Sequence, residues 1–539
     1  MEGKIDSELL LALDVPEKER IKTDDLNVGY SDGVWELIVR YSHNIATEVT
    51  DLNGSIKELL GGYGLVRIPR ENIDRLAETD GVLFIEKPKS LQYELLYSKI
   101  ISCMEPDVNR NGKGGEGVYV AVIDSGIDYF HPDFIVDGKT RIAVIYDEVT
   151  GRVYSREDID NAIAENNRSL IMDKSGHGTS VAGIAAGNNG VAFKSDIIVV
   201  KLGEDNFFST ARLMEGVDFA LKFAMENNRP IAINISIGNN YGAHDGTSLF
   251  ETYIDYVTEI WKNNVIVGAG NEADKRIHTM VKLNDRRKMC EFIVGNYEES
   301  IAIQIWKRYW DDFYIEIENP SGERYVVPKG EGIYEFKSTD ELIYVGTATP
   351  YSYNSEILIQ IIPDNVYVKN GIWQIMFYPD SIKDGKIDLW ISGRTMLTGQ
   401  TGFTSAVPET TLTIPSTSYR VITVGAYNGR TFSYAPFSGR GNTKNLVTVK
   451  PDISAPGVDI SAPYPGGGYR LASGTSVAAP FVTGATAILM EWGIVKGNDF
   501  FMYGERLKAK LIKDSIQNNG QNIWPNRLLG WGLLCLKII

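Results

Sequence analysis

The amino-acid sequence predicts an α/β fold in three parts: a three-layer domain with a mainly parallel sheet, a small N-terminal α+β domain and an inserted β-sandwich. The first part follows from apolar strands that alternate with helices between residues 118 and 268. This alternation is typical of parallel sheets covered by helices on both faces. A strand-helix pattern in residues 34 to 86 predicts the second part, and evenly spaced strands rich in Tyr and Trp in residues 276 to 408 predict the third.

Length, charge and composition exclude several classes of function. The 539 residues exceed a single hydrophobic core, so two to four domains are expected. The net charge of −16 argues against nucleic-acid partners and against anionic membrane surfaces. No apolar stretch approaches the roughly 20 residues of a spanning helix, so no membrane insertion is expected. The N-terminus has no secretory-signal pattern, and Cys103, Cys290 and Cys535 are odd in number and far apart, which predicts reduced, buried thiols inside a cell.

The N-terminal region begins with an apolar stretch at residues 7 to 15, which predicts a helical arm that packs on the body of the protein. Two strand-helix-strand units follow, and they predict an α+β domain of about 70 residues. Its strands are expected at residues 34–41, 64–68 and 81–86, and its helices at 45–52 and 70–78.

The larger α/β domain is expected to contain strands at 118–123, 197–202 and 231–236 and helices at 210–227 and 251–263. The inserted region is expected to contain strands at 301–306, 313–317, 357–362 and 371–377. Turns such as Asn319-Pro320-Ser321-Gly322 separate these strands, which predicts a β-sandwich of jelly-roll type. The α/β pattern resumes at residue 410, so the sandwich interrupts that domain.

One serine is placed as a nucleophile would be. Ser476 lies in Gly474-Thr475-Ser476-Val477-Ala478-Ala479-Pro480, at the start of an Ala-rich run that predicts a buried helix from Val477 to Met490, where Pro480 is tolerated only in the first turn. The positive end of a helix dipole stabilises negative charge that develops on a substrate carbonyl. The competing interpretation is that Ser476 only caps the helix.

Two further residues favour catalysis over capping. His177 opens another Ala-rich helix in Ser175-Gly176-His177-Gly178-Thr179-Ser180-Val181-Ala182-Gly183, and a serine nucleophile needs such a base. Asp124 follows the buried strand 118–123 at its carboxyl end, where α/β sheets place their sites, and it can orient an imidazole.

These three segments resemble, in the same order, the signature motifs of subtilisin-like serine proteases. The resemblance implies a subtilisin-like fold and a catalytic triad of Asp124, His177 and Ser476. The segment Ile266 to Glu272 resembles the oxyanion-hole segment of the family. That implies that the Asn271 side chain and the Ser476 backbone N–H bind the oxyanion.

The family resemblance also implies the substrate-binding residues. Ser236, Ile237 and Gly238 resemble the segment that pairs with an extended substrate, and Gly268, Ala269 and Gly270 resemble the facing wall of the specificity pocket. The chain is thus divided into a propeptide-like region at residues 1–94, the catalytic domain at 95–275 and 409–539, and the sandwich at 276–408.

The N-terminal α+β domain resembles the inhibitory propeptide of subtilases, whose tail lies in the active cleft. We therefore expect the chain to cut itself between residues 89 and 96, near Tyr93 or Glu94, and the freed propeptide to stay bound. The whole architecture is similar to clostridial spore-germination subtilases of Csp type. That resemblance implies a serine endopeptidase that activates a precursor protein, in the cytoplasm or associated with a spore.

Cofactors are not expected. Many subtilases cage calcium in a longer loop after the His helix, whereas residues 186–192 run almost directly into the next strand. This leaves too few oxygen ligands for the six to eight that calcium prefers. Asp128 and Asp133 could serve a weaker calcium site, but they are interpreted as structural residues.

Two other classes of function remain open. Some Csp-type proteins have lost triad residues, so a catalytically silent regulator or scaffold with the same fold is the main alternative. A further hypothesis is that the sandwich binds carbohydrate, although aromatic residues that alternate with the strand period more often fill a core.

Overall fold

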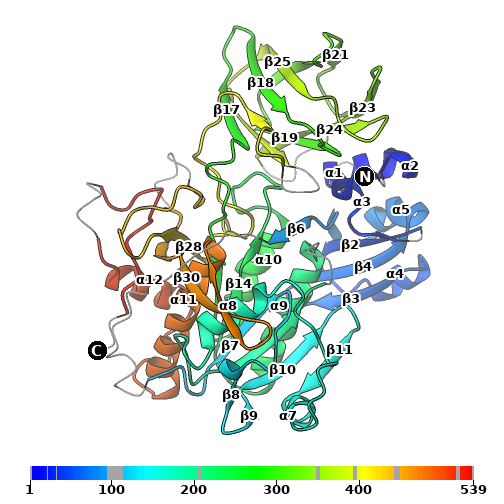
Figure 1. The fold of residues 1–539 in the computed structure, drawn as a ribbon. Helices are drawn as coiled ribbons and strands as arrows, with labels where there is room; N and C mark the ends of the chain where they lie inside the picture. The colour runs from blue at the N-terminus through cyan, green and yellow to red at the C-terminus, as the bar shows by residue number, and fades with distance from the viewer. Residues whose placement is uncertain are drawn as a thin grey trace. The chain divides into compact units, whose positions relative to one another are not determined.

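A computed structural model describes residues 3–20, 22–31, 33–93, 113–203, 208–347, 353–392, 397–441, 449–517 and 523–536 (Figure 1). The chain divides into two compact units. Unit 1 comprises Met1–Ser90, Asn240–Leu249 and Asp274–Pro408, and unit 2 comprises Leu91–Asn239, Phe250–Ala273 and Glu409–Ile539. The predictions for the Cys103 thiol and for cleavage at Glu94 to Leu96 concern residues that lie outside the described ranges.

Unit 2 is built on a sheet in which every neighbouring pair of strands is parallel except at one edge, where β11 runs antiparallel to β10. This is the mainly parallel sheet that the sequence predicted. Its strands lie in the order β11 (Arg152–Ser155), β10 (Ile142–Asp147), β12 (Asp196–Lys201), β7 (Tyr119–Asp124), β14 (Ile231–Ile235), β16 (Asn263–Gly268), β28 (Ile422–Tyr427) and β29 (Ile453–Pro456).

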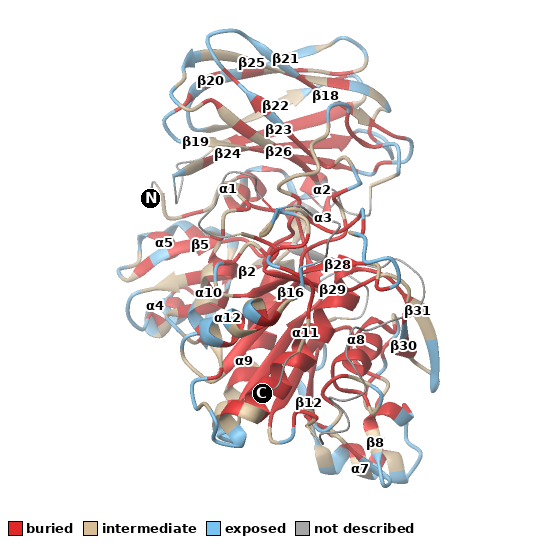
Figure 2. Ribbon diagram, turned by 90° about the vertical axis from the view of Figure 1, so that its left-hand side faces the viewer, coloured by how far each residue is buried: buried red, intermediate tan, exposed pale blue. Residues whose placement is uncertain are grey.

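Helices cover both faces of this sheet (Figures 1 and 2). On one face α8 (His177–Ala186) and α11 (Thr475–Met490) pack against each other and against the side chains of Val122 and Val199. Ile123 and Val200 follow Val122 and Val199 in their strands, so their side chains point to the other face. There they lie next to Gly216 of α9 (Thr210–Glu226). Helix α10 (Leu249–Val257) ends six residues before the predicted boundary. Remaining elements of unit 2 are η2 (Pro132–Phe134), β8 (Ile135–Val136), β9 (Lys139–Thr140), α7 (Arg156–Ala164), β30 (Ile460–Tyr464), β31 (Gly468–Ala472), η3 (Glu491–Val495) and α12 (Gly504–Asp514).

The segment Thr475–Val495 is the one described helix that is long and apolar enough to cross a membrane, contrary to the expectation that no apolar stretch has that length. In this fold 94% of its most apolar window is buried inside unit 2. Its apolar surface is therefore used for packing, as in the central helix of a globular core (Figure 2).

Unit 1 contains the small N-terminal domain, whose strands are antiparallel. The predicted elements are present, together with two strands, β1 and β3, that the sequence did not suggest. The elements are β1 (Tyr30–Ser31), β2 (Val34–Tyr41), α4 (Ala46–Asp51), β3 (Ser55–Leu59), β4 (Tyr63–Pro69), η1 (Arg70–Asn72), α5 (Ile73–Glu78) and β5 (Val82–Glu86).

Unit 1 also contains a sandwich of two antiparallel sheets around a shared apolar core that includes Phe292, Ile303, Trp373 and Leu389. One sheet has the order β17 (His278–Lys282), β26 (Lys386–Ser392), β19 (Ile301–Arg308), β24 (Asn354–Pro363), β23 (Glu341–Thr347) and β22 (Gly332–Lys337). The other has the order β21 (Arg324–Val327), β20 (Asp312–Glu318), β25 (Gly371–Ser381), β18 (Lys288–Val294) and β27 (Gly402–Phe403). Cys290 is buried on β18, and burial raises the pKa of its thiol to about 12, whereas Cys535 in unit 2 is only half-buried.

The N-terminal arm joins the small domain to the sandwich. Helix α1 (Ser7–Asp14) packs on β23 and β24, and α2 (Glu17–Arg20) and α3 (Asp24–Asn27) follow it. Leu9 and Leu11 of the arm share one core with Trp35 of the small domain and with Tyr344 and Leu358 of the sandwich. The predicted packing of the arm is thus present, and its partner is the sandwich.

A cluster of buried charges lies beneath this arm, next to the segment that leaves the small domain. Lys87 Nζ lies 3.2 Å from Glu8 Oε1, and Lys89 Nζ lies 3.8 Å from the other oxygen of Glu8. Glu86 accepts a hydrogen bond of 3.1 Å from the backbone N–H of Leu249. Glu356 of β24 accepts hydrogen bonds from the Ser7 hydroxyl and from the Gln304 amide.

Carboxylates outnumber lysines in this cluster, and burial raises the pKa of Asp6, Glu86 and Glu356. The pKa of Glu356 rises to about 7, because desolvation and the nearby charge of Glu8 outweigh the attraction of Lys89. The folded chain therefore holds protons here that the unfolded chain has lost.

We predict that this cluster makes unit 1 less stable as pH rises. A carboxyl with a raised pKa stabilises the fold fully below its unfolded pKa of about 4.3 and loses that contribution as pH rises through about 7. The effect of Glu356 on the free energy of unfolding is at most about 4 kcal/mol. Between pH 5 and 8 the melting temperature of Glu356→Gln should fall less than that of the wild type. Glu335→Gln changes an exposed carboxylate, so its melting temperature should fall as much as that of the wild type. An unchanged slope in Glu356→Gln would contradict this assignment.

Candidate active site

Asp124 and His177 meet at the buried junction of a strand and a helix. Asp124 is the last residue of β7 and His177 is the first residue of α8. The Nδ1 atom of His177 lies 2.8 Å and 2.9 Å from the two carboxylate oxygens of Asp124. Asp124 is fully buried and His177 almost so. This geometry fixes the imidazole so that Nδ1 carries a proton toward the carboxylate and Nε2 is left to act as a base.

Glycine at position 178 is required for this approach. A Cβ atom there would lie 2.2 Å from the carbonyl oxygen of Gly126 and 3.2 Å from Cβ of Asp124. Helix α8 can therefore come close enough to β7 only because its second residue has no side chain.

A buried carboxylate that sequence reasoning missed, Asp173, holds this junction together. Its Oδ2 atom accepts from the N–H and the hydroxyl of Thr179, at 2.9 Å and 2.6 Å, and so caps helix α8. Its Oδ1 atom accepts from the N–H of Gly176 at 2.8 Å and from the Ser125 hydroxyl at 2.7 Å. Asp173 thus contacts residues next to both Asp124 and His177, which makes it a positioning residue. The sequence holds one feature that could have indicated Asp173: it lies four residues before His177, which opens a helix.

Ser476 is the second residue of α11, which begins at Thr475. Pro480 therefore lies in the second turn and not in the first turn as expected, and it provides no N–H to the carbonyl of Ser476 four residues earlier. That carbonyl accepts a hydrogen bond of 3.0 Å from the Ser236 hydroxyl instead. Ser236 in turn accepts from the Asn234 amide at 2.8 Å, so the backbone of Ser476 is tied to the end of β14.

Asn271 lies beside the start of the same helix. Its Oδ1 atom accepts from the backbone N–H of Thr475 at 2.8 Å and from the Thr475 hydroxyl at 3.2 Å. Asn271 is only 6% exposed, and its Nδ2 atom is a buried donor without a partner among the described residues. A buried donor of this kind is costly unless a ligand or a transition state accepts its hydrogen bond.

The other predicted binding residues surround this point. Gly268 and Gly270 flank Ala269, whose N–H donates to the carbonyl of Val424. A Cβ at Gly268 would lie 3.0 Å from the Thr475 hydroxyl, and one at Gly270 would lie 2.8 Å from the Thr413 methyl group. These glycines let the segment before Asn271 approach the start of α11.

Ile237 and Gly238 form β15 (Ile237–Gly238), which pairs antiparallel with β6 (Ser90–Tyr93). Ile237 pairs with Tyr93 and Gly238 with Gln92. Strand β6 lies between β15 and β13 (Phe208–Ser209) in a small sheet. A segment that follows the small N-terminal domain in sequence thus occupies the position of an extended peptide beside β15.

Asp128 and Asp133, considered above as weak calcium ligands, accept hydrogen bonds from N–H groups of the protein. Asp128 accepts from the backbone N–H groups of Phe130 and Gly466, and Asp133 accepts from the Asn189 amide at 2.9 Å. Among the described residues, no group of three or more His, Cys, Asp or Glu side chains is arranged to hold a metal ion.

A guanidinium group occupies the loop after α8. Arg141 donates to the carbonyl oxygens of Asp133 and Ser195, at 3.1 Å and 2.9 Å, to that of Ala186 and to Oδ1 of Asn188, at 3.1 Å. Burial lowers the pKa of Arg141 to about 10, so it stays charged at neutral pH. One side chain thus satisfies oxygens that would otherwise suit a cation.

Comparisons with known proteins show the family of the chain. The family model described as "Subtilase family" matches residues 115–327 and 398–532, and the model described as "Csp protease B prodomain" matches residues 3–89. The chain therefore belongs to the subtilase family of serine proteases and carries an N-terminal prodomain.

A solved structure described as the CspB protease of Clostridium perfringens is 35% identical, with a TM-score of 0.76, and the alignment covers 81% of this chain and 94% of that one. The minor extracellular protease Vpr of Bacillus subtilis is 24% identical over 89% of this chain, which spans 60% of the length of Vpr. A subtilisin-like protease of Coccidioides posadasii is 29% identical over 32% of this chain and 42% of its own length.

We predict that the loop after α8 depends on Arg141 and not on calcium. Removing the guanidinium leaves several buried oxygens without donors, which should lower the free energy of unfolding by at least about 2 kcal/mol. The melting temperature should decrease clearly in Arg141→Leu. It should decrease less in Arg156→Leu, the control, which removes an ion pair with Asp196. EDTA should not change the melting temperature of the wild type. A melting temperature that falls with EDTA and recovers with calcium would refute this view.

Proposed function

We propose that the chain is a serine endopeptidase in which Ser476 attacks the peptide carbonyl. His177 takes the proton from the Ser476 hydroxyl and returns it to the leaving amine. Asp124 keeps the imidazole in the required tautomer and stabilises its protonated form. The Asn271 amide and the Ser476 backbone N–H bind the oxygen that becomes negatively charged.

The observation that carries this proposal is the arrangement of two polar groups that are expensive to bury. The Asp124 carboxylate is fully buried against Nδ1 of His177, and the Asn271 amide presents a buried donor with no partner among the described residues. A scaffold that only binds partners would gain nothing from either feature. Acyl transfer uses both, since it protonates the imidazole and creates an oxyanion.

Asn271→Ala should lower kcat by roughly 10² to 10³, the effect of removing one side-chain donor from a subtilisin oxyanion hole. KM should change little, because the amide contributes mainly when the oxyanion forms. Steady-state hydrolysis of a chromogenic peptide measures both constants. Asn264→Ala, at another buried asparagine in unit 2, is a control for general loss of packing. An unchanged kcat for Asn271→Ala would remove this residue from the oxyanion hole.

Self-processing is the second part of the proposal. The antiparallel register of β6 on β15 supports it, because the chain leaves Tyr93 on the side of Ser236, which is hydrogen-bonded to the Ser476 carbonyl. A strand in that position resembles a bound product, so the peptide bond that is cut lies close after Tyr93 or Glu94. The tail keeps its main-chain hydrogen bonds after cleavage, so the prodomain remains bound and restrains the enzyme.

Wild-type chain should therefore be isolated as two fragments that co-elute, with the new N-terminus between residues 90 and 97. Ser476→Ala should remain a single chain of 59.9 kDa, because no nucleophile is left to cut it. Intact mass and N-terminal sequencing decide between the outcomes. A wild-type chain that stays whole, or a cut far outside this segment, would contradict the proposal.

We also infer that the enzyme activates a precursor protein, as in germination, and that it acts in the cytoplasm or associated with a spore. The similarity to the CspB protease supports the peptidase and its prodomain. We also infer that the sandwich is a jelly roll inserted between Asn271 and Ser476. Its strand orders support this, since β17 to β20 alternate between the two sheets and β24 to β26 do so again.

A further inference from the structure

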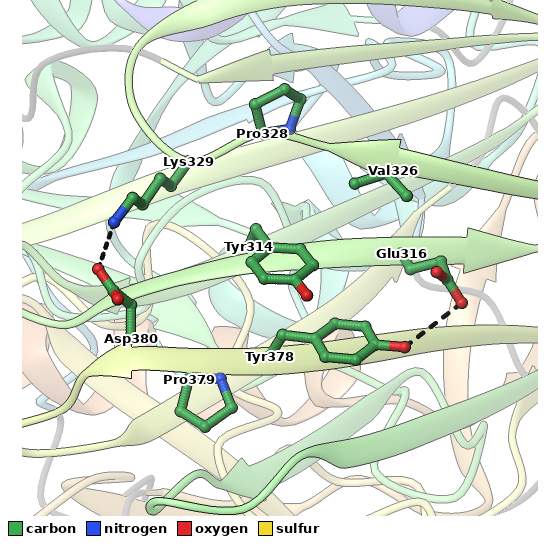
Figure 3. A pocket seen from close by; sticks show the side chains of 8 residues that line it. All are labelled: Tyr314, Glu316, Val326, Pro328, Lys329, Tyr378, Pro379 and Asp380. Atoms are coloured by element: carbon green, nitrogen blue, oxygen red, sulfur yellow. Dashed lines mark hydrogen bonds and ion pairs between the residues drawn. The ribbon is translucent and has the colours of Figure 1, made fainter.

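An open pocket with a volume of about 520 Å³ lies on the solvent face of the sandwich (Figure 3). It belongs to unit 1 and contains none of the residues proposed for peptide hydrolysis. It is lined by Tyr314, Glu316, Val326, Pro328, Lys329, Tyr378, Pro379 and Asp380.

Two tyrosines form the floor of this pocket. Tyr314 of β20 and Tyr378 of β25 are direct cross-strand partners, with ring centroids 4.6 Å apart and ring planes within 3° of each other. The preceding residues in each strand, Phe313 and Phe377, point into the sandwich core. Strand alternation therefore turns the tyrosines toward solvent, and Tyr314 is 37% exposed. The expectation that aromatic residues of the insertion fill its core is wrong for this pair.

Charged groups stand at both ends of the tyrosine pair (Figure 3). At one end Lys329 forms an ion pair with Asp380. At the other end Glu316 accepts from the Tyr378 hydroxyl at 3.5 Å and lies 3.7 Å from the Arg324 guanidinium. Each end thus offers hydrogen-bond donors and acceptors side by side, and each charge already has an opposite charge next to it.

We propose that this pocket binds a neutral oligosaccharide. One face of a sugar ring consists of C–H groups that pack on aromatic and proline side chains, and its edge carries hydroxyls that both donate and accept. That combination matches an aromatic floor whose two ends hold paired donors and acceptors. An ionic ligand would have to compete with ion pairs that are already formed. A proline-rich peptide matches the floor, but proline has no N–H to donate to Glu316 or Asp380.

Titration calorimetry with chitotetraose and cellotetraose tests the proposal on full-length Ser476→Ala, which cannot digest itself under the function proposed above. At least one of the two tetrasaccharides should bind saturably. Tyr314→Ala and Tyr378→Ala should each weaken that binding about tenfold or more, and Glu316→Gln should weaken it less. Tyr367→Ala is the matched control, since this half-exposed tyrosine packs on Tyr297 outside the pocket.

Melting temperatures equal to that of the parent show that the variants are folded, and they are required before any loss of binding is assigned to the pocket. Absence of binding by both tetrasaccharides would overturn the proposal, as would binding that Tyr314→Ala and Tyr378→Ala leave unchanged. Binding of decaproline at the tyrosine pair, without binding of either saccharide, would assign the pocket to a peptide instead. None of these outcomes depends on peptidase activity, so this proposal and the proposed function fail independently.

Discussion

The contact between the end of β7 and the start of α8 is the constraint on which the site depends. It places the Asp124 carboxylate 2.8 Å from His177 Nδ1 in the interior of unit 2, where an uncompensated charge would be expensive. The contact is possible because Gly178 has no side chain and because Asp173 binds donors from both sides of the junction. The geometry of Asp124 and His177 is thus set by the packing of regular elements and not by loops.

The same principle operates at Ser476. Helix α11 is held by a chain of polar groups that runs from Thr483 through Asn234 and Ser236 to the Ser476 carbonyl. Pro480 provides no helical N–H to that carbonyl, and the Ser236 hydroxyl is the donor that takes its place. A residue that normally weakens a helix here connects the helix to the strand beside which the substrate is expected to lie.

Short motifs explain why much of this could be predicted from the sequence. Asp124, His177, Asn271 and Ser476 each lie where a buried strand or an Ala-rich helix begins or ends, so local pattern and chemistry indicated them together. Arg141 could not be identified in that way, since its role comes from contacts with residues far apart in the chain. Asp173 has a weak local signal, but its link to Ser125 is visible only in the fold. Strand β3 was missed because Ser55 to Leu59 is largely exposed and lacks an apolar run. The shared core of the N-terminal arm and the sandwich depends on tertiary packing that no local pattern encodes.

The proposed function requires that Ser476 is an activated nucleophile. Prolonged incubation of the wild-type chain with excess fluorophosphonate, followed by peptide mapping, tests it directly, because excess probe competes with the tail beside β15. We expect a covalent label on the Ser476 hydroxyl that forms much more slowly in His177→Ala and Asp124→Asn. An unlabelled Ser476, or equally fast labelling in His177→Ala, would contradict the claim and favour a catalytically silent protein with the same fold.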